Sequence, residues 1–135
     1  MCTIMKIYNT PYCQLQHLKE QNAILCEWKA PCKGDDYRNP LKFATKEIEK
    51  HKIGTWITDT TNGFKSEEAD TQWLLEEFVP SMINSSIEKV IFIIANDSPL
   101  IEEIKAQEMA LSKYFKVVLV ESLIDIEKNK RFLDE

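Results

Sequence analysis

Glycine is scarce in this chain, and the motifs that glycine-rich segments carry are absent. Only three glycines occur in 135 residues. Neither G-x-G-x-x-G nor G-x-x-x-x-G-K-[ST] is present, so the sequence does not predict the phosphate-binding loops built on those motifs. No repeat, low-complexity tract or Gly/Ser/Pro-rich linker divides the chain either, and residues 1–135 are therefore expected to form one domain.

Long apolar runs and an excess of basic residues are also missing. No apolar run approaches the roughly 20 residues needed to span a bilayer, and residues 1–11 lack the features of a signal peptide. We therefore expect a cytoplasmic protein with no membrane span. The chain has 22 acidic and 17 basic residues, a net charge of −5. Because nucleic-acid binding depends on neutralising phosphates, nucleic acid is not an expected partner.

The four cysteines do not have the spacing of a metal site. Cys2, Cys13, Cys26 and Cys32 include no C-x-x-C pair, and only His17 lies among them. Structural zinc sites favour four closely spaced Cys or His ligands. Free cysteines within apolar runs usually behave as small buried hydrophobes. The sequence therefore predicts reduced core thiols, with no metal and no other cofactor.

The first half of the chain predicts a hairpin followed by a helix. The strand-like segments 12–18 and 23–29 flank the polar residues 19–22, which is typical of an antiparallel hairpin. The helix is expected to start near Asp35 or Asn39, because Pro40 is tolerated only in a first turn. Its apolar stripe consists of Tyr37, Leu41, Ala44, Ile48 and His51.

The second half predicts strands that alternate with helices. Residues 55–59 form a short strand, and Ser66 is a suitable N-cap for a helix that Pro80 should kink or end. Residues 89–95 are nearly all apolar, which is typical of a central strand covered on both faces. A helix from Ser98 to about residue 113, a strand at 117–120 and a last helix at 122–133 follow.

These elements predict an α/β fold in the order β-β-α-β-α-β-α-β-α. Helices between strands favour parallel neighbours, while the first two strands add an N-terminal antiparallel hairpin. The expected structure is a four- or five-stranded mixed sheet with helices packed on it.

Several of these residues carry a resemblance to a known family. The order Trp56-x-x-Asp59, Asp70-x-x-Trp73, Glu76 and Pro80, followed by the apolar residues 90–95, resembles small bacterial STAS-like proteins. These proteins have the fold of anti-sigma-factor antagonists and are grouped by fold with CRAL-TRIO domains. The likeness covers nearly the whole chain and implies a single cytoplasmic STAS-like domain. For many members it implies no established biochemical function.

The resemblance also implies a regulatory alternative. In phosphorylation-controlled antagonists the switch serine lies in the loop that enters the second helix, in a pattern close to Asp-Ser-Ser-Gly. The corresponding candidates here are Ser66, Thr60 and Thr61. The acidic residues Glu67 and Asp70 would repel a phosphate at Ser66, although a helix N-terminus favours one.

The strand-end loop and the helix start after it form the candidate site. A binding or regulatory role would use Trp56, Asp59, Phe64, Ser66, Asp70 and Trp73. Our leading hypothesis is a non-enzymatic module that binds a protein partner or a small apolar ligand through these residues, since aromatic side chains offer both area and a polar handle.

Three other interpretations stay open at this point. Asp59 with Glu67 or Asp70 could act as the carboxylates of a hydrolase or isomerase, because open α/β sheets place functional residues at strand ends. Asp59 could instead only stabilise the turn through backbone N–H groups. A homodimer with Trp28 or Phe64 in its interface is the third alternative.

Overall fold

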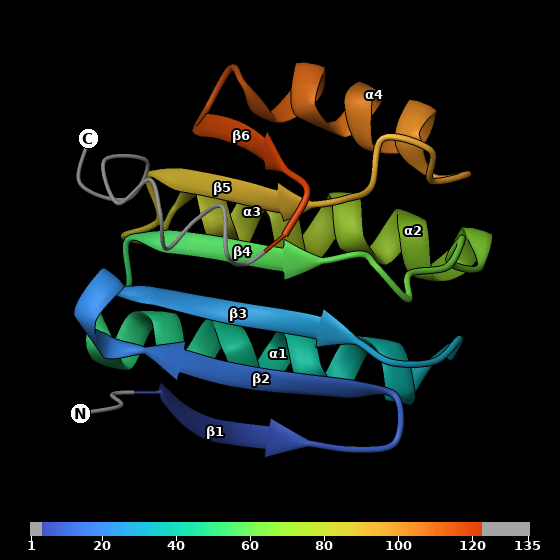
Figure 1. The fold of residues 1–135 in the computed structure, drawn as a ribbon. Coiled ribbons are helices and arrows are strands. Elements are labelled where there is room, and N and C mark those ends of the chain that lie inside the picture. The colour runs from blue at the N-terminus through green and yellow to red at the C-terminus, as the bar shows by residue number, and fades with distance from the viewer. Residues whose placement is uncertain (1–3, 123–135) are drawn as a thin grey trace.

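A computed structural model describes residues 4–122, which form six strands and four α-helices on one sheet (Figure 1). The strands are β1 (Ile4–Asn9), β2 (Cys13–Leu18), β3 (Ala23–Trp28), β4 (Thr55–Asp59), β5 (Lys89–Ile93) and β6 (Lys116–Val120). The α-helices are α1 (Asp35–His51), α2 (Glu68–Trp73), α3 (Val79–Ile83) and α4 (Ile101–Leu111). A π-helical turn, η2 (Leu74–Phe78), joins α2 to α3, and a short 3₁₀ turn, η1 (Lys19–Gln21), joins β2 to β3.

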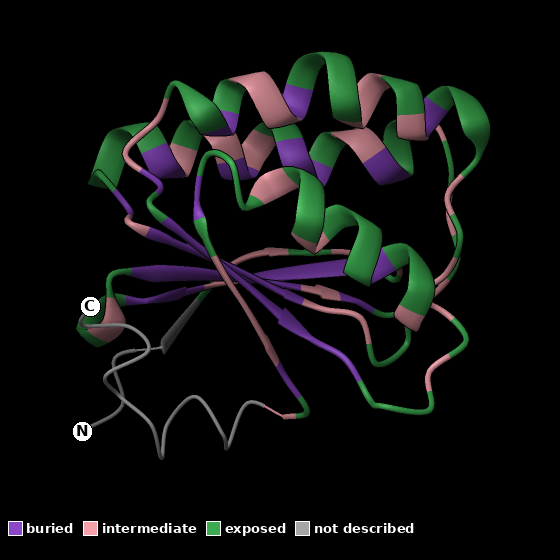
Figure 2. Ribbon diagram, turned by 90° about the horizontal axis from the view of Figure 1, so that it is seen from above, coloured by how far each residue is buried: buried purple, intermediate pink, exposed green. Residues whose placement is uncertain are grey.

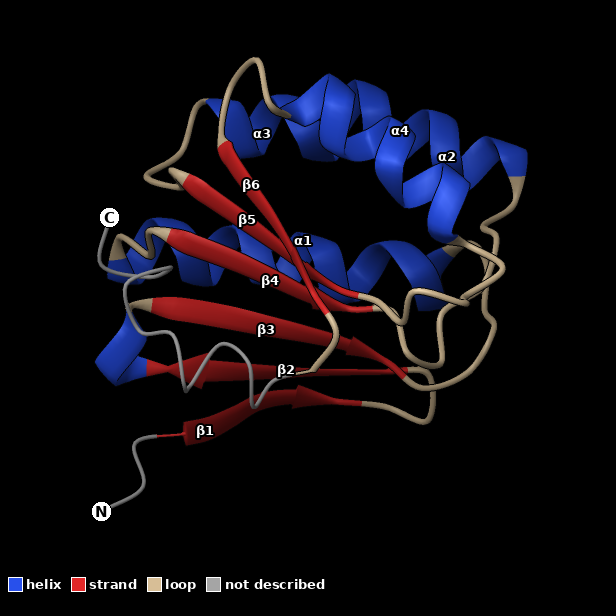
Figure 3. Ribbon diagram, turned by 45° about the horizontal axis from the view of Figure 1, so that its top comes forward, coloured by secondary structure: helices blue, strands red, loops and turns tan. Residues whose placement is uncertain are grey.

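The six strands lie side by side in the order of the sequence. The pairs β1–β2 and β2–β3 are antiparallel, and the pairs β3–β4, β4–β5 and β5–β6 are parallel. Crossovers of constant hand that always step in the same direction put their helices on the same side of a sheet. Figures 2 and 3 show all four helices on one face. The prediction of a mixed α/β sheet with an N-terminal hairpin is confirmed.

The predicted number of four or five strands is wrong, because β1 adds a sixth strand. Its sequence, Ile-Met-Lys-Ile-Tyr-Asn, is too mixed in polarity to stand out as a strand. Pairing with β2 forms it, with an irregularity in register between Lys6 and Tyr8. The predicted hairpin of β2 and β3 is present. Asn22 closes its turn in the left-handed region with a φ of 52°, which asparagine tolerates better than most residues.

The structure decides between the two candidate starts of α1, and it shifts the predicted start of α4. Helix α1 begins at Asp35, the earlier of the two candidates, and Pro40 lies buried in its second turn. Helix α4 begins at Ile101 rather than at Ser98. The hydroxyl of Ser98 accepts a hydrogen bond from the N–H of Leu100 at 3.1 Å, so Ser98 stabilises the turn that precedes the helix. The last predicted helix, at 122–133, lies outside the described residues except for Ser122.

Both faces of the central strands are buried. In register across β3, β4 and β5, Ile24, Trp56 and Val90 face the helices, and their neighbours face the opposite side. The opposite side carries a second apolar cluster of Leu18, Ala23, Leu25, Ile57, Ile91, Ile93 and Val120. All five residues of β5 are buried, which confirms the prediction of a central strand covered on both faces.

A pair of histidines lies where β2 meets the end of α1. The rings of His17 and His51 are 5.0 Å apart, and His17 is buried. Burial lowers the pKa of His17 from 6.5, His51 and Lys19 lower it further, and Glu47 opposes them. Because the pKa is lower in the folded protein, the unfolded state binds more protons as the pH falls below about 6.5, and folding is destabilised there.

We therefore expect the variant His17→Gln to lose less stability in acid than the wild type. The measurement is the free energy of unfolding in urea at pH 7 and at pH 5. The difference between the two pH values should be smaller in the variant, since the variant has no ring to protonate on unfolding. Equal differences in the two proteins would contradict the role assigned to His17.

Candidate functional site

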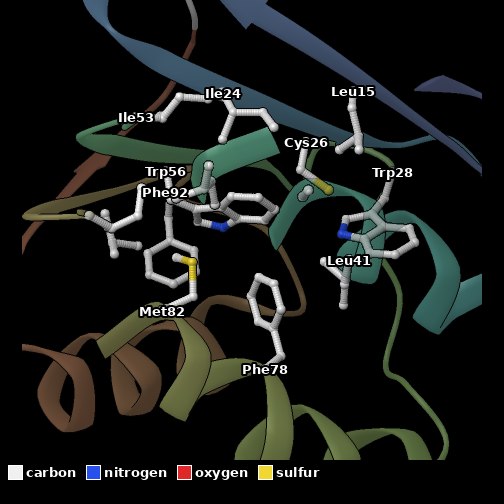
Figure 4. Packing of buried hydrophobic residues seen from close by; sticks show 14 of the residues in the cluster. Leu15, Ile24, Cys26, Trp28, Leu41, Ile53, Trp56, Phe78, Met82 and Phe92 are labelled. Carbon is white, nitrogen blue, oxygen red and sulfur yellow. The ribbon is translucent and has the colours of Figure 1, made fainter. Parts of the chain in front are cut away.

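A cavity of about 400 Å³ lies between the helix-covered face of the sheet and the helices. Figure 4 shows Trp56 and Phe92 from the sheet opposite Phe78 and Met82 from the helices. The sheet contributes Trp28, Trp56, Thr58, Val90 and Phe92. The helices contribute Tyr37, Leu41, Thr71, Leu74, Phe78, Val79, Met82, Glu103, Ile104, Ala106, Gln107 and Leu111. The lining is therefore largely apolar, and such cavities usually receive small molecules.

Side-chain alternation along β4 decides which predicted residues reach the cavity. Trp56 and Thr58 line it, whereas Ile57 belongs to the cluster on the opposite face of the sheet. Successive side chains of a strand point to opposite faces, so Asp59 lies on the side of Ile57. Its Oδ1 accepts a hydrogen bond from the N–H of Thr61 at 2.9 Å. This contact is the turn-stabilising interaction that the sequence offered as one interpretation of Asp59.

Aromatic side chains form two groups around the cavity. In the first, Trp28 stacks on Tyr37 with ring centroids 5.1 Å apart, and Phe64 packs edge-on against both rings. In the second, Trp56 and Phe78 pack edge to face at 5.3 Å. All five rings line the cavity. Trp28 and Phe64 thus contact each other within the fold, where the sequence had offered them as a dimer surface.

A short chain of hydroxyl groups lies at the end of the cavity near α1 and α2. Ser66 Oγ and Thr71 Oγ1 are 2.6 Å apart, and Ser66 also hydrogen-bonds to the phenol of Tyr37. Burial raises the pKa of Tyr37 to about 12, and the hydrogen bond to Ser66 acts in the opposite direction. The phenol is therefore protonated at neutral pH and available as a hydrogen-bond partner.

Ser66 is not the helix N-cap that the sequence predicted. Helix α2 begins at Glu68, with Glu67 at the cap position, and no side chain caps it. The hydroxyl of Ser66 is used by Thr71 and Tyr37 instead. Glu67 and Glu68 are exposed, as expected for acidic residues that face the positive end of a helix dipole.

Asp70 ties the start of α2 to the start of α1. Its Oδ1 accepts from Arg38 Nε at 2.9 Å, and its Oδ2 accepts from the N–H of Gly34 at 2.9 Å. Asp70 is only 2% exposed. The guanidinium of Arg38 also lies 5.7 Å from the ring centroid of Trp73. Gly34 has a φ of +61° and a ψ of −133°, a conformation that only glycine adopts readily.

The π-helical turn explains how the helix passes Pro80. The N–H of Val79 bonds to the carbonyl of Leu74, five residues earlier, and Pro80 has no N–H to donate. The extra residue in this turn shifts the helix face, so that Phe78 is buried against Trp56. Pro80 thus lies early in α3, and the predicted kink or end takes the form of a π turn. Such turns are frequent at functional sites.

The cavity brings together only part of the predicted site. Trp56, Phe64 and Ser66 line it, as does Thr60. Asp59, Asp70, Trp73 and Thr61 are not among its lining residues. The sequence did not predict the contributions of Tyr37, Leu41, Phe78, Met82, Phe92 and Ile104. Tyr37 and Leu41 belong to the predicted apolar stripe and Phe92 to the predicted buried strand, but periodicity alone does not distinguish a side chain that lines a cavity from one that packs solidly.

The described residues contain no metal cluster and no membrane-spanning helix. Within residues 4–122, no three His, Cys, Asp or Glu side chains are placed to hold a metal ion together. No helix in that part of the chain has the length and apolarity to cross a bilayer. Cys13 and Cys26 are buried free thiols with their Sγ atoms 3.7 Å apart. This confirms their predicted placement in the core.

Comparison with known proteins does not assign the chain to a family. No protein-family model, curated protein or solved structure matches it. The resemblance to STAS-like proteins therefore stays a prediction from the sequence motifs, and the geometry of the cavity is the basis for a functional proposal.

Proposed function

We propose that this protein is a non-enzymatic binding module whose cavity takes a small apolar ligand. The single observation that supports the proposal is the cavity of about 400 Å³, which is lined by several aliphatic side chains and by the aromatic rings of Trp28, Tyr37, Trp56, Phe64, Phe78, Phe92 and Phe115. A ligand that buries about 200 Å² of apolar surface there would gain about 5 kcal/mol from desolvation. Binding would then be coupled to the loop between β4 and α2, because Phe64 and Ser66 belong to both.

The hydrolase or isomerase alternative receives no support from the placement of its carboxylates. Asp59 faces the other side of the sheet and accepts from Thr61. Asp70 is buried and bonded to Arg38, and Glu67 is exposed. General acid–base catalysis needs such groups within reach of one substrate, and these three do not line the cavity.

The protein-partner and phosphoswitch alternatives remain proposals, separate from the proposal of an apolar ligand in the cavity. Ser66 and Thr60 are half-buried, and the hydroxyl of Thr60 donates to the carbonyl of Ile93 at 2.7 Å. Thr61 is exposed, so of the three candidates its hydroxyl is the most accessible to a kinase. Phosphorylation would be detected as a mass increase on the peptide that contains these residues.

The neutral dye N-phenyl-1-naphthylamine tests the apolar-ligand proposal, because its emission rises when it leaves water. We expect saturable enhancement with the wild-type protein. Ala106 is exposed and lines the rim of the cavity on α4, so the variant Ala106→Phe should obstruct entry. Its affinity for the dye should fall at least about tenfold, which corresponds to about 1.4 kcal/mol.

Lys105 provides the matched control. It is exposed on the same helix, does not line the cavity and, lying two residues from both Glu103 and Gln107, faces the other side of the helix. Lys105→Phe therefore adds the same side chain without obstructing the rim, whereas Ala110 neighbours the lining residues Ala106 and Gln107 one turn away. This variant should bind the dye as the wild type does. The proposal fails if the wild type gives no saturable enhancement, or if the two variants bind the dye equally well.

A further inference from the structure

We infer that the ligand of the cavity is a flat ring compound with a hydrogen-bond acceptor, and that the indole N–H of Trp56 donates to that acceptor. This inference rests on the proposed function and adds to it the chemical class of the ligand. Two features of the cavity support it, namely the arrangement of its aromatic rings and the state of its polar groups.

The aromatic rings favour a ring over a flexible chain. Trp28, Tyr37 and Phe64 form one array with centroid distances between 5.1 and 6.3 Å. Trp56 and Phe78 form a second array at 5.3 Å. Aromatic pairs at such distances gain energy beyond their buried area. A flat ligand that packs against either array extends these contacts, whereas an alkyl chain gains only from the area that it buries.

Trp56 supplies an indole N–H that has no hydrogen-bond partner in the part of the chain that is described. Its side chain is 5% exposed, lines the cavity and makes its ring contact with Phe78. The indole N–H is a donor only, and it lies open to the cavity, because Trp56 Nε1 is not one of the fully buried, unpartnered side-chain atoms of the described residues. Figure 4 shows the indole nitrogen of Trp56 on the ring edge nearer to Phe78 and Met82. A ligand oxygen at that edge would satisfy it.

The hydroxyl groups of the lining point to the same ligand chemistry. Tyr37, Ser66 and Thr71 have three hydroxyl protons, and the two hydrogen bonds that join them use two. One proton therefore remains to be donated. The hydroxyl proton of Thr60 is already given to the carbonyl of Ile93. The groups next to the rings thus include hydrogen-bond donors without an acceptor in the described part of the chain, and a carbonyl, carboxylate or ether oxygen of the ligand would accept from them.

The ketone 9-fluorenone and the hydrocarbon fluorene test this inference, because they share one flat skeleton and differ in a carbonyl group. A buried carbonyl without a donor is costly, while a hydrogen bond is worth about 1 kcal/mol. We therefore expect the wild type to bind fluorenone several-fold to tenfold more tightly than fluorene. Binding is followed through the three indole N–H resonances of the protein, which single Trp→Phe variants assign.

The variant Trp56→Phe keeps an aromatic ring and removes the N–H. In this variant the preference for fluorenone should disappear or reverse, while the affinity for fluorene stays within about threefold of the wild-type value. Trp73→Phe is the matched control, because Trp73 does not line the cavity, and it should keep the preference. Trp28→Phe reports whether the indole of Trp28 contributes instead.

The outcomes separate this inference from the proposed function. If both compounds bind equally well, or if Trp56→Phe keeps the preference, the acceptor inference is overturned while ring binding still supports the cavity. If neither compound binds but N-phenyl-1-naphthylamine does, the ring and acceptor class is wrong and the binding function stands. If neither the compounds nor the dye bind, both proposals fail.

Discussion

Replacing Asp70 with alanine should lower the free energy of unfolding by about 3 kcal/mol, measured by urea denaturation. Breaking one partner of a buried ion pair typically costs about 3–5 kcal/mol, because the other charge is left without compensation. The lower end applies here, since Asp70 is buried while the side chain of Arg38 is 30% exposed. The substitution also leaves the N–H of Gly34 without its acceptor, which adds to the loss.

The control for this prediction is Glu68→Ala in the same helix. Glu68 is exposed, so its loss removes only a helix-dipole interaction worth less than about 1 kcal/mol. Arg38→Gln should cost much less in the Asp70→Ala background than in the wild type, because the two residues act as a pair. Equal small losses for Asp70→Ala and Glu68→Ala would show that the link between α1 and α2 contributes little to stability.

The contrast between Asp70 and its neighbours shows how far the sequence predicts the site. Glu68 and Asp70 lie in the first turn of α2 and Glu67 lies at its cap position, and carboxylates at a helix N-terminus are a local signal that the sequence shows. The partner of Asp70 is not a local signal. Arg38 lies 32 positions away in the sequence, and only the packing of α2 beside α1 brings the two together.

The fold was more predictable than the cavity for a related reason. The continuous apolar run at β5 and the periodic apolar stripe on α1 are local patterns of residue type, and such patterns can be recognised in the sequence alone. The strand β1 has no such pattern and depends on pairing with β2. Asp59 and Trp56 belong to one short strand, yet alternation sends them to opposite faces. We predicted Trp56 and Asp59 as parts of one site because the prediction did not take into account that side chains alternate between the faces of a strand.

The π turn is a second feature that residue patterns do not reveal. Pro80 predicts a disturbance of the helix, but several responses are available to a chain that loses one backbone hydrogen bond. Here the response is an extra residue in the preceding turn, with the N–H of Val79 bonded to Leu74. This extra residue sets the direction of the Phe78 side chain, which forms one wall of the cavity.

Replacing Phe78 with alanine should lower the free energy of unfolding by about 3–5 kcal/mol, the usual cost of removing a buried aromatic side chain. Phe78 is 6% exposed and contacts both Trp56 and Trp73. Leu75 is the matched control, because it belongs to the same π turn and is 60% exposed. Leu75→Ala should change stability by less than about 0.5 kcal/mol.

The Phe78→Ala variant also tests whether the cavity and the binding function belong together. The space left by the ring adjoins the existing cavity, so N-phenyl-1-naphthylamine should still bind and should raise the urea midpoint of the variant. At 100 times its dissociation constant a ligand adds about 2.7 kcal/mol to stability, which would offset most of the loss. If the dye stabilises the wild type but not the folded variant, dye binding depends on contacts with the ring of Phe78. A variant that loses less than 1 kcal/mol would show that this wall of the cavity is not packed as the structure describes.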